Sequence, residues 1–159
     1  MNLNVFAVAG LARHPGRGLN ATMGDRDEFL RWFDTAWRDA EVALHNGDAG
    51  PRFETWSERA PVTLFGAWRN AEDPAGAREV FRELAQAFSQ ATSSEVELIA
   101  ADASGDLAYT VQREITSTIV NGEPRQYVLR VTQVYRREDG NWKVVHRHGD
   151  EELGADKGP

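Results

Sequence analysis

The chain contains no cysteine, so it can form no disulfide, offer no thiolate nucleophile and bind no metal through cysteine. Absence of cysteine is typical of a cytoplasmic protein. No apolar run approaches the ~20 residues that cross a bilayer, and we expect no membrane contact. Acidic residues outnumber Lys and Arg by 25 to 18, giving a formal net charge of -7. An acidic surface repels phosphate backbones, so we expect no nucleic-acid partner.

At 159 residues the chain has the length of one domain, which can bury roughly 70% of its unfolded surface. We expect a structureless or artefactual leader over residues 1–24, a domain over 25–150 and an acidic tail over 151–159. The apolar run 3–11 precedes its basic neighbours, which is the wrong order for a secretory signal.

A long first helix is the strongest local prediction. Asp25 and Glu28 have the spacing of a capping box. Apolar residues then recur at helical intervals, at Phe29, Leu30, Phe33, Ala36, Trp37, Ala40 and Leu44. Asn46-Gly47 provides the stop. A short second helix is expected from Pro51, and a third from Pro74 with Asp73 as its cap.

The second half of the chain predicts an antiparallel meander of four strands. Residues 95–101 alternate, and three long strands follow between residues 106 and 150. Asn121-Gly122 and Asp139-Gly140 are strong hairpin turns. Helices followed by strands indicate an α+β fold. We expect a cone-shaped, curved antiparallel sheet wrapped around about three N-terminal helices, with a pocket at its open mouth.

Three stretches carry a family resemblance: residues 61–68, residues 131–140 and the closing strand Trp142-Lys-Val-Val-His-Arg-His148. With the order of elements, they resemble the SnoaL-like, ketosteroid-isomerase-like families of the nuclear transport factor 2 superfamily over roughly residues 26–150. The resemblance implies the cone-shaped fold. It leaves the activity open, because members isomerise, dehydrate, hydrolyse epoxides, cyclise, or only bind and assemble.

The chain departs from the steroid-isomerase site at three places. Residues 64–68 offer no carboxylate where the Asp base would lie, Trp37 stands near the place of the Tyr, and residues 131–134 contain no acidic donor. Steroid isomerisation is therefore not expected.

The closing strand supplies the candidate catalytic residues. Alternation along the strand places Trp142, Val144, His146, His148 and Asp150 on one face. A histidine there could act as acid, base or hydrogen-bond donor, and Asp150 could orient His148. The same pair could instead be packing or interface residues, or two ligands of a metal. We expect no metal, because two imidazoles do not make a site.

Four further residues are candidate ligand contacts. Arg130 lies within a strand, where it either points inward to clamp an anion or outward to pair with a neighbour such as Glu114. Trp68 is expected near the cone mouth, where it can stack on a flat ligand. Tyr109 and Gln133 are candidate polar tips in the pocket.

Two functions stay open at this point. The first is a pocket that binds a small organic molecule and transforms it by cofactor-free acid–base chemistry, such as isomerisation, dehydration or hydrolysis. The second is a non-catalytic module for dimerisation or ligand binding. In both, we expect a homodimer formed through the outer face of the sheet.

Overall fold

A computed structural model of the protein describes residues 23–152. The expected leader lies outside this range except for residues 23 and 24, and the expected acidic tail lies outside it except for residues 151 and 152. The elements, in chain order, are α1 (Asp25–Trp32), the π-helix η1 (Phe33–Trp37), α2 (Arg38–His45), α3 (Gly50–Thr55), β1 (Thr63–Phe65), β2 (Asn70–Ala71), α4 (Pro74–Ala87), β3 (Phe88–Ser104), β4 (Leu107–Val120), β5 (Glu123–Glu138) and β6 (Asn141–Glu151).

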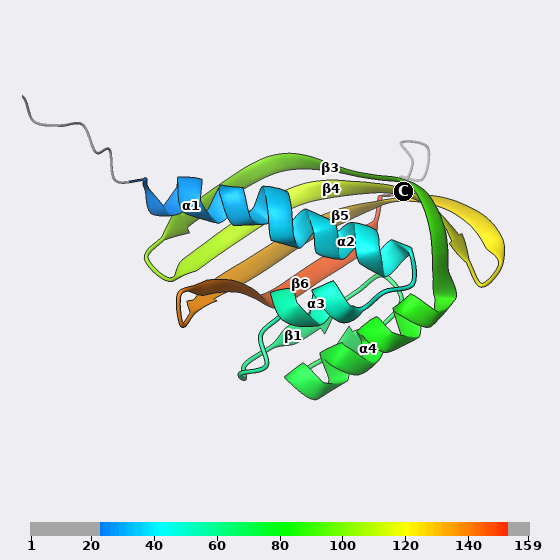
Figure 1. Ribbon diagram of the computed structural model, residues 1–159, viewed down its shortest axis with the longest axis horizontal. Coiled ribbons are helices and arrows are strands. Elements are labelled where there is room, and N and C mark those ends of the chain that lie inside the picture. The colour runs from blue at the N-terminus through cyan, green and yellow to red at the C-terminus, as the bar shows by residue number, and fades with distance from the viewer. Residues whose placement is uncertain (1–22, 153–159) are drawn as a thin grey trace, which may run out of the picture.

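One mixed sheet of six strands forms the body, in the order β2-β1-β6-β5-β4-β3. The predicted meander of four antiparallel strands is confirmed, and β1 joins it in parallel beside β6. The long strands curve over the rod made by α1, η1 and α2, while α3 and α4 lie below this rod (Figure 1). The fold is therefore the expected α+β arrangement of a curved sheet around helices.

Local signals explain most element ends. Both predicted hairpin turns put two consecutive residues at positive φ, with Asn121 at 50° and Gly122 at 85° in the first. The Asp73 cap is confirmed, since its Oδ1 accepts a hydrogen bond of 2.7 Å from Gly76 N. The capping box at Asp25 is wrong: Gly24 is the N-cap residue of α1, and Asp25 instead accepts from the backbone of the β3–β4 turn.

The first rod is continuous, as predicted, but its middle turn is π-helical. The π-helical turn is a rare geometry. Across it, every fourth side chain stays buried, from Phe29, Phe33 and Trp37 to Glu41 and His45. This row of buried side chains therefore begins in an aromatic core and ends in polar groups. Within residues 23–152, no helix is both long and apolar enough to cross a membrane.

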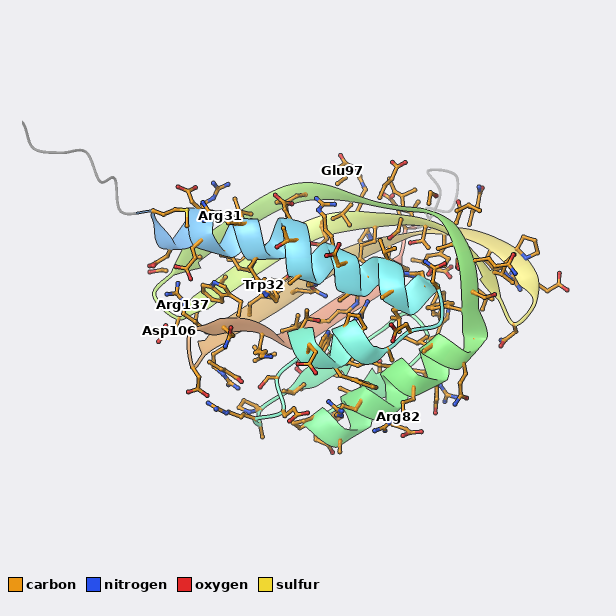
Figure 2. All side chains as sticks on the ribbon, in the orientation of Figure 1. Arg31, Trp32, Arg82, Glu97, Asp106 and Arg137 are labelled. Carbon is orange, nitrogen blue, oxygen red and sulfur yellow. The ribbon has the colours of Figure 1, made fainter. Side chains whose placement is uncertain are left out.

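The narrow end of the cone is filled by aromatic rings. Phe29 lies 4.8 Å from Tyr135 and 5.3 Å from Trp142, measured between ring centroids. Trp32 meets the Tyr135 ring edge-on at 5.8 Å. Arg137 holds this end together from outside, because its guanidinium faces Asp106 and the first turn of α1 (Figure 2). The helices and sheet are thus packed against each other through these rings at the narrow end.

A β-bulge in β6 overturns the predicted alternation of the closing strand. Tyr135 pairs with Val144, but its neighbour Val134 pairs with His146, so Val145 is an extra residue in β6. Trp142 and Val144 face inward as expected. Beyond the bulge the faces are exchanged, and the inward positions belong to residues 147 and 149 rather than to His146, His148 and Asp150.

Candidate functional site

The wide end of the cone contains an inner cavity of about 50 Å³ beneath a larger mouth of about 1090 Å³. The two spaces share wall residues from four different parts of the fold: Trp68, Arg69, Leu84, Phe88 and Tyr127. A benzene-sized ring needs a cavity of ~150 Å³. The inner cavity therefore has room for a small polar group, and the mouth has room for a molecular body.

Aromatic rings form the entrance. Trp68 is half exposed and meets Tyr127 edge-on at 5.2 Å and Phe88 at 6.3 Å. A tight loop places it there, because Gly66 N donates to Arg69 O at 2.9 Å. A Cβ at Gly66 would come within 2.8 Å of that oxygen, so only glycine allows this turn. Trp68 thus lies in the wall of the mouth, and its stacking on a ligand stays a prediction.

A buried ion pair lies on the cavity wall. Arg147 donates from Nη1 to Glu114 Oε1 at 2.8 Å and from Nη2 to Oε2 at 2.6 Å, and both side chains are under a tenth exposed. Gln112 donates a third hydrogen bond to the carboxylate. Burial alone would raise the pKa of Glu114, but the Arg147 guanidinium overcomes it and holds that pKa below its usual range. Glu114 is therefore a fully coordinated carboxylate.

A second buried pair joins α2 to α3. Glu41 contacts the Arg52 guanidinium, and each side chain is only 4% exposed. Arg52 also lies over the Phe81 ring, 5.2 Å from its centroid. This pair is less well satisfied than the first, because Glu41 Oε1 and Arg52 Nε have no partner in hydrogen-bond geometry. The predicted short helix is present but begins at Gly50, one residue before Pro51, and it turns Arg52 inward.

His45 and Tyr127 make a hydrogen-bonded pair at the boundary between cavity and mouth. His45 Nδ1 lies 2.7 Å from the Glu41 carbonyl oxygen, which can only accept, so Nδ1 carries the proton. Its Nε2 is then the acceptor for the Tyr127 hydroxyl at 2.8 Å. Burial lowers the pKa of His45, and burial also raises the pKa of Tyr127, so both are neutral near pH 7. The geometry allows one proton to pass between the Tyr127 hydroxyl and the imidazole.

The structure brings three predicted site residues together, but on the outer face of the sheet. Arg130, His148 and Asp150 line a shallow depression of about 280 Å³ there. Arg130 points outward and donates to Asp150 at 2.7 Å, so Asp150 binds this guanidinium. His146 also faces away from the cavity, with Nδ1 2.7 Å from the Thr63 hydroxyl. Tyr109 is exposed on the same outer face. A catalytic role for the two histidines and Asp150 stays a prediction.

Gln133 faces inward, as expected of a polar tip, but it lines neither the inner cavity nor the mouth. Its Oε1 accepts from Tyr135 at 2.5 Å, and Tyr135 in turn is 2.9 Å from the Thr110 hydroxyl. It belongs to the polar network behind the cavity. Among residues 23–152, no group of three or more His, Asp or Glu side chains is arranged to hold a metal ion.

Sequence reasoning missed the residues of the inner cavity. Glu41 and His45 carried a readable signal, because they continue the four-residue spacing of Phe29, Phe33 and Trp37. The signal for Glu114 was weaker. Alternation along β4 put Glu114 on the polar face of the strand but did not say whether this face points into the cone or outward. The sequence contained no signal for Arg147, because the bulge at Val145 determines which face of the sheet its side chain lies on.

The two ion pairs of the sheet predict contrasting energetics. We expect Arg147→Met to lower the free energy of unfolding by about 3–5 kcal/mol, because it leaves the Glu114 carboxylate buried without its partner. The double variant Glu114→Leu/Arg147→Met should recover most of this loss. The exposed pair Arg130–Asp150 is the control, and Arg130→Met should cost no more than about 1 kcal/mol. Urea unfolding measures all three, and an Arg147→Met cost as small as the control's would contradict the buried pair.

His45 predicts a pH dependence of stability. Its folded pKa lies below the value of 6.5 of an exposed histidine, so the unfolded chain binds more protons in that range. Stability is therefore full above about pH 6.5 and declines as pH falls through the folded pKa. We expect His45→Gln to reduce this decline, and the non-titrating control Val42→Ala to retain it. Thermal unfolding across this pH range measures the effect, and an unchanged decline in His45→Gln would show that His45 is not its source.

Known proteins share this architecture. The model of the SnoaL-like domain family matches residues 35–149. A candidate dehydratase of the nuclear transport factor 2-like family from Streptomyces avermitilis is 16% identical, with a TM-score of 0.65 over 80% of this chain and 99% of its own. A ketosteroid isomerase-like protein from Erwinia carotovora atroseptica is 15% identical, with a TM-score of 0.64 over 80% and 99%.

A third similar structure is a candidate calcium/calmodulin-dependent protein kinase type II association domain from Thiobacillus denitrificans. It is 19% identical, with a TM-score of 0.63 over 76% of this chain and 94% of its own. No curated protein sequence matches. At these identities the solved structures establish the fold, and the family match covers well over half of the chain. The chain belongs to the SnoaL-like domain family.

Proposed function

We propose that the protein binds a small organic molecule in the cone, with an apolar or aromatic body in the mouth and one polar group in the inner cavity. The observation that carries this proposal is the stepped space at the wide end. Aromatic rings line its entrance, and buried charged groups line its base. Such a site gains affinity from apolar contact and orientation from a few polar groups.

The chemistry that fits the site is cofactor-free proton transfer. The Tyr127 hydroxyl can accept a proton from a bound molecule while its own proton moves to His45 Nε2, and the reverse transfer restores the pair. Glu41 lies on the same cavity wall, where its Oε1 contacts the Arg52 guanidinium. An isomerisation or a dehydration needs no more than such a proton relay, in keeping with the name of the Streptomyces neighbour.

Blocking the mouth tests the binding proposal without removing a charge. Leu84 lies on α4 in the wall of both spaces, and we expect Leu84→Trp to close the passage between them. Glu79→Trp is the matched control, because it adds the same ring to the exposed side of the same helix. Native mass spectrometry of gently purified protein should detect a bound molecule in wild type and control, reduced about tenfold or more in Leu84→Trp. Equal occupancy in all three would contradict the proposal.

A second property, self-association, is favoured by the outer face of the sheet. Large apolar side chains are exposed there at Ile99, Leu107, Tyr109 and Ile115. The charges among them are already paired within the face, as in Arg113–Glu97 and Arg130–Asp150. We therefore propose that a second copy of the chain covers this face, since two such surfaces meet without net repulsion. One neighbour is itself named as an association domain.

Sedimentation velocity tests this dimer. We expect the wild-type chain to sediment as a dimer, and Ile99→Lys to weaken association about tenfold or more, because it buries an unpaired charge. Val42→Lys is the control, as Val42 is also an exposed β-branched apolar residue but lies on the helical layer. A wild-type monomer, or equal weakening by both substitutions, would contradict an interface on the outer face.

A further inference from the structure

The mouth of the cone is open along one side because β6 stops before β5 does. The β5–β6 ladder ends where Leu129 pairs with Glu151, whereas β5 is paired with β4 from Glu123 onward. The β4–β5 hairpin therefore projects past the end of β6 (Figure 1). Over residues 123–128, β5 has no strand paired to it on that side among the described residues. The mouth can therefore reach round this free edge to the outer face of the sheet.

Residues from both faces of the sheet line the mouth. Thr116 and Tyr127 face into the cone, and their chain neighbours Ile115 and Val128 face outward. All four belong to the wall of the same space. Ile115 is 37% exposed and is also one of the large apolar side chains of the outer face. The mouth and the outer face therefore share apolar surface.

An ion pair connects the two surfaces as well. Arg113 lies on the outer face, where it contacts Glu97 at 3.3 Å and Glu152 at 3.1 Å. Glu152 also lines the mouth. A second copy that covers the outer face around Arg113 therefore stands beside the open side of the mouth. In an isologous dimer the same holds for both copies, so each copy borders the mouth of the other.

We propose that the second copy of the chain completes the open side of the mouth, so that ligand binding and dimerisation strengthen each other. This inference rests on both parts of the proposed function, the ligand site and the dimer through the outer face. A partner that covers Ile115 and Val128 removes apolar surface beside the ligand from water, and the ligand gains affinity as more of its own apolar surface is buried. The coupling is reciprocal, because a ligand that prefers the dimer must stabilise the dimer by the same free energy.

The uncharged fluorescent probe prodan, a naphthalene ketone, tests this coupling, because its aromatic body suits the mouth and its emission changes on burial. Its affinity is measured by fluorescence titration of the full chain, at protein concentrations above and below the dimer dissociation constant from sedimentation velocity. We expect the wild-type dimer to bind the probe at least about fivefold more tightly than the wild-type monomer does. Saturating probe should in turn lower the dimer dissociation constant at least about fivefold.

Three variants separate the partner's contribution from direct contact with the probe. Ile99 is exposed on the outer face and does not line the mouth, so Ile99→Lys disrupts the interface without touching the probe site. We expect this variant to bind the probe as weakly as the wild-type monomer at every protein concentration. The control Val42→Lys adds the same charge on the helical layer and should keep the tight binding of the dimer. Leu84→Trp narrows the mouth from inside and should weaken probe binding while leaving dimerisation unchanged.

The outcomes separate this inference from the proposed function. Equal or tighter probe binding by the monomer, or full probe affinity in Leu84→Trp, overturns the inference alone. A wild-type chain that is monomeric at every concentration overturns it together with the proposed dimer. Absence of probe binding to the wild-type dimer overturns it together with the proposed ligand site. The wild-type titration across the dimer dissociation constant decides the inference even if Ile99→Lys fails to fold, which circular dichroism establishes.

Discussion

The bidentate pair between Glu114 and Arg147 is the interaction on which the wide end of the cone depends. Its two residues come from β4 and β6, with β5 between them, so both strands must turn these positions inward. Removing two charges from water costs several kcal/mol per ion, and well-packed apolar residues are often at least as stable. Stability therefore does not explain the pair. Both of its residues line the inner cavity, where Glu41 and Arg52 form a second buried pair.

The polarity of β4 runs against the usual rule for a half-buried strand. Its inward face is polar: Thr110, Gln112, Glu114, Thr116 and Thr118 are buried. Its outward face carries Leu107, Tyr109 and Ile115, which are exposed. A polar interior costs free energy unless it is bonded, and most of this one is, through Tyr135, Gln133 and Arg147. This exchange of polar and apolar faces links the two proposals. The polar inner face would serve the proposed ligand site, and the apolar outer face would meet the proposed partner.

Membership of the SnoaL-like family defines the scaffold, and the site decides the chemistry. The family resemblance would place a steroid isomerase's catalytic groups near Trp37 and Gln133, whose side chains are a buried indole and a buried amide. Its own titratable groups lie elsewhere, on the last turn of the first rod and on β5. Burial lowers the pKa of His45 and raises the pKa of Tyr127, so both side chains are neutral. The proposed proton relay between them therefore depends on burial.

Local signals in the sequence determined the fold, whereas the site depended on contacts distant in the chain. Asp73 capped its helix, and Asn121-Gly122 turned its hairpin, because capping and positive φ are properties of a few adjacent residues. The spacing from Phe29 to His45 already placed two residues of the cavity wall, Glu41 and His45, on the buried side of the helix. The face of His146 and Arg147 was decided only by tertiary structure. One extra residue, Val145, exchanges the two faces of a strand, and a bulge forms where sheet curvature requires it, which alternation along the chain does not encode.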